Sequence, residues 1–265
     1  MLDRALVQYP LGIALFAVFS ILGTAFAQHD VADVPAAEHK LDANLRYFLI
    51  GAEHAAPADG YKLLVVLPGG DGGEAFQPFL KRIHQNVLGE EYLMLQLIAP
   101  KWNRRQQVVW PTKGLREAGM KTATEDFIAA AVEDVKQRTK INDKNVFALG
   151  WSSGGPAVYA ASVAEGTPLT GSFVAMSVFK PAHMGDLSRA DDHAYYILHS
   201  KEDPICPYRM AEQARDQLGK AGAEVTLATY AGGHGWRGNV VGNLRDGVTW
   251  LEEHAASETE SNTAP

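Results

Sequence analysis

The chain has 265 residues, of which 46% are hydrophobic and 21% are charged, and its formal net charge is −7. This is the composition of a globular protein long enough to bury a large core, and the negative charge with no basic run excludes a nucleic-acid surface, so we expect no nucleic-acid partner. The single cysteine, Cys206, excludes an internal disulfide, and no cysteine and histidine cluster has the spacing of zinc ligands.

The first predicted element is an apolar run over residues 11–26, which follows Arg4 and leads into the sequence Ala25-Phe26-Ala27 before polar Gln28. It predicts a secretory signal peptide over residues 1–27, cleaved after Ala27. An uncleaved membrane anchor is the alternative, because the run approaches the ~20 residues that span a bilayer. Both interpretations place the rest of the chain outside the cytoplasm, secreted, periplasmic or membrane-anchored. We expect no stable membrane partner unless this segment stays uncleaved.

Residues 28–44 are polar without periodicity, and residues 257–265 are small and polar. We predict that both are flexible, since neither can bury enough apolar surface to order itself. No glycine-rich or serine-rich linker divides the chain between them. The sequence therefore predicts one domain over residues 45–256.

Within this domain, short apolar runs alternate with stretches of helical spacing. The runs predict strands buried on both faces and are LRYFLIG, YKLLVVLPGG, YLMLQLIAP, NVFALGWS, GSFVAMS, AYYILHS and AEVTLATY. Helices are predicted over residues 124–139, 207–220 and 240–254, and the first has acids in its opening turn. This alternation predicts an α/β fold, with a mostly parallel central sheet and helices on both faces.

The stretch ALGWSSGGPAVY, residues 148–159, joins a predicted strand to a predicted helix and contains the pattern Gly-x-Ser-x-Gly. A nucleophile on so sharp a turn has strained backbone angles, so the flanking positions must be nearly free of side chains. Ser152 fits this pattern, and the N–H of Ser153 can then point at the oxyanion of an acyl intermediate. A plain glycine-rich turn is the alternative, whereas the patterns of a phosphate-binding loop are absent.

A serine nucleophile needs a histidine to take its proton and an acid to orient that histidine. Asp203 follows the strand AYYILHS and His234 lies in the glycine-rich loop after AEVTLATY, so both come at carboxyl ends of strands, where ligands of α/β sheets bind. The order Ser152, Asp203, His234 is that of α/β-hydrolases and predicts a catalytic triad. Glu202 is the alternative acid, and weaker candidates are Asp191, Asp192, His183, His193 and His199.

The loop LPGGDGG follows the strand KLLVVL, and its glycines let backbone N–H groups approach a substrate oxygen closely. Gly70 is predicted as the second oxyanion donor, and a flexible connection is the alternative reading of this loop. A substrate pocket is predicted from residues near Ser152 and His234 and from the long connection over residues 101–121. For each tryptophan among them, a position in the hydrophobic core is the alternative. These pocket residues are Asp71, Trp102, Trp110, Trp151 and Trp236.

The motifs GWSSGG, HSKEDPICP and AGGHGW resemble the α/β-hydrolase superfamily. Within it they are similar to the phospholipase/carboxylesterase group, which includes acyl-protein thioesterases and is close to the dienelactone hydrolases. The resemblance covers residues 60–255. It implies a hydrolase of small-molecule carboxylic esters that works through an acyl-enzyme and needs no metal or other cofactor. It carries the triad onto Ser152, Asp203 and His234, and the oxyanion donors onto Gly70 and Ser153.

Two features depart from this group. Pro68-Gly69 stands where typical members have His-Gly, and the predicted signal peptide is unusual because the best-known members are cytosolic. Secreted relatives in the superfamily include polyester depolymerases and the feruloyl and acetyl xylan esterases. The esters that these enzymes cleave are therefore possible substrates of this chain. The alternative functions are a serine peptidase of the prolyl-oligopeptidase type, for whose extra domain this chain has no room, and a catalytically silent hydrolase-like binding domain.

Overall fold

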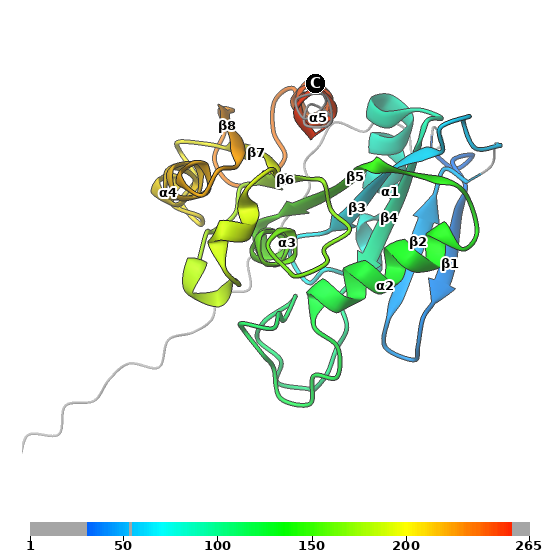
Figure 1. The fold of residues 1–265 in the computed structure, drawn as a ribbon, viewed down its shortest axis with the longest axis horizontal. Helices are drawn as coiled ribbons and strands as arrows, with labels where there is room; N and C mark the ends of the chain where they lie inside the picture. The colour runs from blue at the N-terminus through cyan, green and yellow to red at the C-terminus, as the bar shows by residue number, and fades with distance from the viewer. Residues whose placement is uncertain (1–30, 53–54, 256–265) are drawn as a thin grey trace, which may run out of the picture.

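The computed structural model describes residues 31–52 and 55–255 (Figure 1). Eight strands form one sheet in the order β1-β2-β4-β3-β5-β6-β7-β8. Strand β1 pairs antiparallel with β2, and β2 pairs antiparallel with β4, while all other neighbours are parallel. The strands are β1 (Ala36–Lys40), β2 (Arg46–Ile50), β3 (Tyr61–Leu67), β4 (Tyr92–Ile98), β5 (Ile141–Trp151), β6 (Gly171–Ala175), β7 (Ala194–His199) and β8 (Glu224–Thr229).

The longer helices cover both faces of the sheet. They are α1 (Gln77–Ile83), α2 (Thr124–Lys136), α3 (Gly155–Ser162), α4 (Tyr208–Lys220) and α5 (Val240–Ala255). Residues of α2, α3 and α4 share one core cluster with the sheet, and residues of α1 and α5 share the other. Figure 1 shows α2 and α3 on one side of the strands and α5 on the opposite side. The predicted mostly parallel α/β architecture is therefore confirmed.

Successive residues of a strand point to opposite faces, and this period assigns each strand residue to one of the two cores. In β3, Leu63 and Val65 belong to the core under α2 and α3, whereas Leu64 and Val66 belong to the core under α1 and α5. All four side chains are almost completely buried. A continuous apolar run is thus what a strand covered on both faces requires.

The seven apolar runs all form strands, and the three predicted helices correspond to α2, α4 and α5. The prediction that residues 28–44 are flexible is wrong for β1, because Ala36–Lys40 pairs with β2 along its whole length. As an edge strand it stays partly exposed, so polar side chains suit it: the Glu38 carboxylate accepts a hydrogen bond of 3.1 Å from Arg46 of β2. The predicted signal peptide and the predicted C-terminal tail lie outside the described residues.

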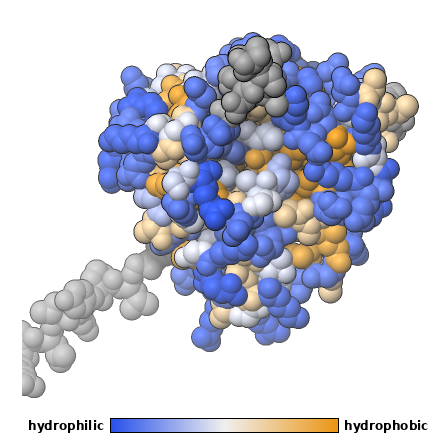
Figure 2. Space-filling model, viewed as in Figure 1, coloured by the Kyte–Doolittle hydropathy of each residue, from blue (hydrophilic) through white to orange (hydrophobic). Residues whose placement is uncertain are grey.

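The parallel strands all direct their carboxyl ends to the same edge of the sheet, where the loops after β3, β5, β7 and β8 meet. The face seen in Figure 2 is largely hydrophilic, with hydrophobic areas between the hydrophilic ones. Within residues 31–52 and 55–255, no helix is long and apolar enough to cross a membrane.

Candidate active site

Ser152 occupies the junction between β5 and α3 and has a backbone φ of +49°. This left-handed conformation is uncommon outside glycine and costs on the order of 1–3 kcal/mol. The neighbouring glycines are required by contact: a Cβ on Gly154 would lie 2.1 Å from the carbonyl oxygen of Leu67, and one on Gly150 would lie 2.6 Å from Val158. The packing of β3 and α3 against the turn therefore explains both glycines of the Gly-x-Ser-x-Gly pattern.

A chain of hydrogen bonds connects three side chains from three loops. The Nε2 atom of His234 lies 3.0 Å from the Oγ atom of Ser152, and its Nδ1 atom lies 2.8 Å from Oδ2 of Asp203. A carboxylate only accepts, so Nδ1 carries the proton and Nε2 of the neutral ring accepts from the serine hydroxyl. The arrangement can remove a proton from Ser152 and stabilise the imidazolium that results.

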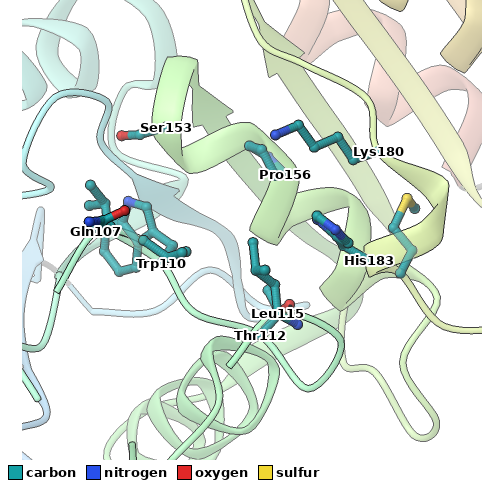
Figure 3. A pocket seen from close by; sticks show the side chains of 11 residues that line it. Gln107, Trp110, Thr112, Leu115, Ser153, Pro156, Lys180 and His183 are labelled. Carbon is teal, nitrogen blue, oxygen red and sulfur yellow. Dashed lines mark hydrogen bonds between the residues drawn. The ribbon is translucent and has the colours of Figure 1, made fainter. Parts of the chain in front are cut away.

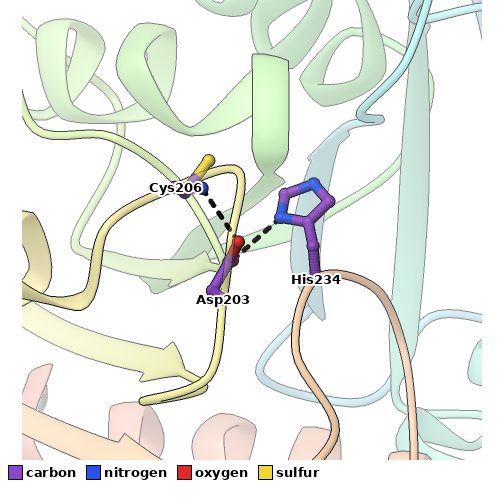
Figure 4. Close-up of side chains that lie close together, drawn as sticks. All are labelled: Asp203, Cys206 and His234. Atoms are coloured by element: carbon purple, nitrogen blue, oxygen red, sulfur yellow. Dashed lines mark hydrogen bonds and ion pairs between the residues drawn. The ribbon is translucent and has the colours of Figure 1, made fainter.

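Asp203 is held by the turn that follows β7. Its Oδ1 atom accepts hydrogen bonds of 2.8 Å from the backbone N–H groups of Ile205 and Cys206, and Oδ2 faces His234 (Figure 4). Burial of this side chain disfavours its charge, but the hydrogen bonds from Cys206, His234 and Ile205 outweigh burial and lower the pKa of Asp203. The group therefore stays ionised beside the imidazole.

The loop that carries His234 depends on glycine and on two side-chain contacts. Gly232 and Gly233 have φ values of +119° and +76°, which favour glycine. The N–H of Gly233 donates to the Oγ atom of Ser200 at 3.1 Å, and the hydroxyl of Tyr230 donates to the carbonyl of Gly233 at 2.8 Å. Ser200 ends the β7 run, so its bond fixes the histidine loop to the aspartate loop. Tyr230 ends the β8 run and holds Gly233 from within the histidine loop. The sequence analysis did not identify either residue.

The loop after β3 lies beside the turn that carries Ser152 and is bonded to it. The Oγ atom of Ser153 donates a hydrogen bond of 2.9 Å to the carbonyl of Gly70, whose φ is +60°. The indole N–H of Trp110 donates to the carbonyl of Pro68, also at 2.9 Å. Pro68 thus takes part in an ordered loop, although it departs from the His-Gly of typical relatives.

The backbone N–H groups of Gly70 and Ser153 are both available to a ligand. Ser153 is in the first turn of the helix that begins at Ser152, where amides have no carbonyl one turn earlier. Within the described part of the chain, the N–H of Gly70 has no backbone acceptor. Ser177, at the end of the β6 run, donates from Oγ to the carbonyl of Ser152 at 2.7 Å and supports the turn. In the sequence, the one feature that could have indicated this role of Ser177 was its place as a polar residue at the end of a predicted strand.

Two pockets flank the three hydrogen-bonded side chains. The first, the Ser153 pocket, has a volume of about 210 Å³ and is lined by the connection before α2, the start of α3 and the segment after β6 (Figure 3). The second, the His234 pocket, has a volume of about 450 Å³ and lies between the aspartate and histidine loops. Residues that line the first include Val108, Trp110, Leu115, Ser153, Pro156 and Lys180, and those that line the second include Glu202, Ile205, His234 and Arg237.

Of the five predicted pocket residues, Trp110 lines the Ser153 pocket, and the other four line neither pocket. Trp151 is 4% exposed and belongs to the core under α1 and α5, because it follows Phe147 and Leu149 on the same face of β5. Its ring packs at 5.6 Å from that of Trp236. Trp151 is therefore a core residue, contrary to the pocket prediction, whereas Trp236 is only partly buried against the same core and its place in a pocket stays a prediction.

Trp102 and Asp71 also differ from the pocket prediction. Trp102 packs against the core on the α2 side, and Asp71 is exposed, with Oδ1 accepting a hydrogen bond of 2.9 Å from the N–H of Gly73. Asp71 thus stabilises its own turn, as aspartate commonly does. Trp110 has a role that the sequence analysis missed, since it is only 2% exposed and bonds the loop that carries Gly70.

The residues that the sequence offered as alternatives to Asp203 and His234 have other surroundings. Glu202 is exposed and has no hydrogen bond to His234, whose Nδ1 faces Asp203. His193 and His199 are buried in the β7 region, where they bond Ser172 Oγ at 2.9 Å and the carbonyl of Cys206 at 2.8 Å. Burial lowers the pKa of both histidines, which holds them neutral. Asp191 and Asp192 are exposed in the turn before β7.

Asp203, Cys206 and His234 offer possible metal-ligand atoms within 4.8 Å of one another (Figure 4). These residues fit a metal poorly, because Asp203 and His234 already bond each other. Burial and the neighbouring Asp203 charge raise the pKa of the Cys206 thiol to about 12, so it is not the thiolate that binds metals. The cluster is better suited to proton transfer than to metal binding.

Comparisons with known proteins show the family and the fold of this chain. The sequence profile of a phospholipase/carboxylesterase family matches residues 89–248. A carboxylesterase from Bacillus cereus is 18% identical with a TM-score of 0.58 over 80% of this chain and 96% of that one. A putative dienelactone hydrolase from Klebsiella pneumoniae is 15% identical with a TM-score of 0.62 over 83% and 99%.

A third solved structure, a carboxylesterase from Mesorhizobium loti, is 15% identical with a TM-score of 0.61 over 80% of this chain and 97% of that one. At these identities the likeness shows a shared fold, which is the α/β-hydrolase fold expected from the sequence. The sequence has no match among curated proteins.

Proposed function

Since the chain belongs to the phospholipase/carboxylesterase family of carboxylic ester hydrolases, we propose that it cleaves esters through an acyl-enzyme formed on Ser152. In this proposal His234 is the general base and Asp203 orients it. The observation that carries the proposal is the continuous hydrogen-bond chain from Ser152 Oγ through His234 to Asp203, at 3.0 Å and 2.8 Å. Such a chain is what activates a serine hydroxyl at neutral pH.

The reaction begins when Ser152 Oγ attacks the ester carbonyl and its proton passes to Nε2 of His234. The carbonyl oxygen becomes an oxyanion that accepts hydrogen bonds from the N–H groups of Gly70 and Ser153. When the ester C–O bond breaks, the histidine returns this proton to the leaving alcohol. Water then attacks the acyl-enzyme and gives a proton to the same nitrogen. When the acyl C–Oγ bond breaks, this proton passes to Ser152 Oγ, and the acid is released.

Labelling with a fluorophosphonate tests the nucleophile, and hydrolysis of 4-nitrophenyl acetate tests the reaction. We expect the probe on Ser152, found by mass spectrometry of the digested protein, and loss of both labelling and turnover in Ser152→Ala. Ser153→Ala keeps the labelled residue and serves as the matched control for the adjacent serine. A folded protein that is neither labelled nor active would overturn the proposal in favour of a silent binding domain, and cleavage of peptides instead of esters would favour the peptidase alternative.

We further infer that residues 1–27 direct export and are removed after Ala27. The apolar run over residues 11–26 and the Ala-x-Ala ending support this inference. Expression of the full chain in a secreting host, followed by N-terminal sequencing, tests it, with Gln28 as the expected first residue. Full-length protein in the membrane fraction would favour an uncleaved anchor, and full-length protein in the cytosol would contradict export.

A further inference from the structure

In the proposed mechanism, the oxyanion donors Gly70 and Ser153 and the general base His234 surround the reacting carbon and divide the site into two sides. The oxyanion faces the N–H groups of Gly70 and Ser153, and the leaving alcohol must lie beside Nε2 of His234 to receive its proton. The acid part of the ester then extends away from the histidine. Because the Ser153 pocket includes Ser153 and not His234, it is the pocket on the acid side. The His234 pocket is on the alcohol side.

The walls of the Ser153 pocket combine apolar surface with a positive charge. Val108, Trp110, Leu115 and Met184 supply apolar surface, and Lys180 is a cation in the same lining. Of the described residues that line this pocket, none is an aspartate or a glutamate, although the chain as a whole has a net charge of −7. A pocket of this composition attracts a negative group more strongly than the surrounding surface does.

Among the residues that the structure describes, the Lys180 ammonium group has no hydrogen-bond partner, and its charge acts on the Cys206 thiol. Lys180 follows β6 and is exposed, and it forms no ion pair within the described ranges. Figure 3 shows its ammonium end directed toward Ser153 across the start of α3. His183, from the next turn, lines the same pocket and adds a ring nitrogen that can bond an oxygen. Both groups come from the segment between β6 and β7.

The size of the pocket limits the acid that it accepts. Its volume of about 210 Å³ lies below the roughly 300–1,000 Å³ of pockets that hold drug-sized ligands. A short acid fits this space, whereas a long fatty acyl chain does not. An acid with a short apolar spacer and a terminal carboxylate matches both the apolar walls and the cation.

We propose that this enzyme prefers esters of short dicarboxylic acids, whose free carboxylate is bound by Lys180 in the Ser153 pocket while the ester carbonyl lies at Ser152. This proposal rests on the proposed function and adds to it the class of acid. Lys180 acts by binding and takes no part in bond making. Because Lys180 is exposed, its attraction for the carboxylate is modest and weakens in salt.

The test compares two methyl esters of similar shape, monomethyl succinate and methyl 4-methylpentanoate, which differ mainly in the terminal charge. The measured quantity is the ratio of their kcat/KM values, with product acids quantified by chromatography. We expect Lys180→Met to lower this ratio about fivefold, since an exposed ion pair contributes up to about that factor. Lys180→Arg should retain most of the ratio, and 0.5 M NaCl should reduce it in the wild type but not in Lys180→Met.

Lys201→Met is the matched control, because Lys201 is exposed and lines neither pocket. An unchanged ratio in Lys180→Met, with both esters cleaved, overturns the dicarboxylate proposal and leaves the esterase function intact. An equal loss of the ratio in Lys201→Met also overturns it, because the effect would then be one of net charge. Failure to cleave any ester, together with no fluorophosphonate label on Ser152, overturns both proposals.

Discussion

The side chain of Ser153 bonds the carbonyl of Gly70, with 2.9 Å between Oγ and the oxygen. This bond connects the two loops that carry the proposed oxyanion donors, which are 83 residues apart in sequence. In the proposed mechanism Ser153 therefore has two roles, since its backbone N–H donates to the substrate and its side chain holds the loop of the other proposed donor in place. Rigid placement of such donors is what makes them effective in the transition state.

Ser153→Ala should lower kcat about threefold to tenfold and change KM little, because one hydrogen bond that positions Gly70 is lost while both backbone donors remain. Steady-state kinetics on a neutral ester checks this. Ser153→Thr keeps the hydroxyl and should recover most of kcat. If Ser153→Ala raised KM and left kcat unchanged, the bond would serve ground-state binding and not the oxyanion loop.

Asp203→Asn should lower kcat on the order of 10⁴-fold, because an amide at this position can donate to Nδ1 and so favours the wrong tautomer of His234. Folding should be preserved, since Oδ1 remains to accept from Ile205 and Cys206. The measurement is kcat alongside a circular dichroism spectrum. Asp192→Asn, at an exposed position with φ of +62° that asparagine tolerates, should keep full activity. Equal activity of the Asp203 variant and wild type would exclude Asp203 as the acid.

Gly154→Ala should destabilise the protein by more than about 3 kcal/mol, because the new Cβ would lie 2.1 Å from the carbonyl oxygen of Leu67 and the backbone cannot move easily there. Gly219→Ala is the control, since α4 contains Gly219 and no atom lies within 4 Å of its added Cβ. That variant should gain about 0.5–1 kcal/mol from helix propensity. Urea denaturation measures both, and equal stability of the two variants would contradict the packing argument.

Stability should fall as pH falls below about 6.5, because His193 is buried as the neutral ring and burial lowers its pKa to about 3. Between these pH values the unfolded chain binds a proton at His193 that the folded state does not bind. Each decrease of one pH unit therefore lowers the free energy of unfolding by up to about 1.4 kcal/mol through this group. Denaturant unfolding at pH 7 and pH 5 measures the slope.

His193→Gln should reduce this slope without abolishing it, because burial also lowers the pKa values of His84 and His199. Between pH 7 and pH 8 both proteins should show the same flat dependence, which controls for a general loss of stability. A slope between pH 7 and pH 5 that is the same in His193→Gln and wild type would show that His193 does not contribute.

The parts of the site that follow from local chemistry were predictable from the sequence. A strand buried on both faces needs an apolar run, and a sharp turn between strand and helix needs glycines, so Ser152 could be placed at a strand end. Asp203 and His234 could be placed in the same way after β7 and β8. The polar strand β1 could not, because the pairing that orders it comes from β2 and not from its own side chains.

The linear order of residues determined the strands, the helices and the loops that carry Ser152, Asp203 and His234, because each of these depends on neighbours within a few positions. Only the tertiary structure decided which side chains line a pocket. Trp151 turned into the core through the alternation of β5, while Trp110 and Lys180, 70 residues apart, came to line the same cavity. Contacts between distant segments depend on how whole layers pack, and no short stretch of sequence contains that information.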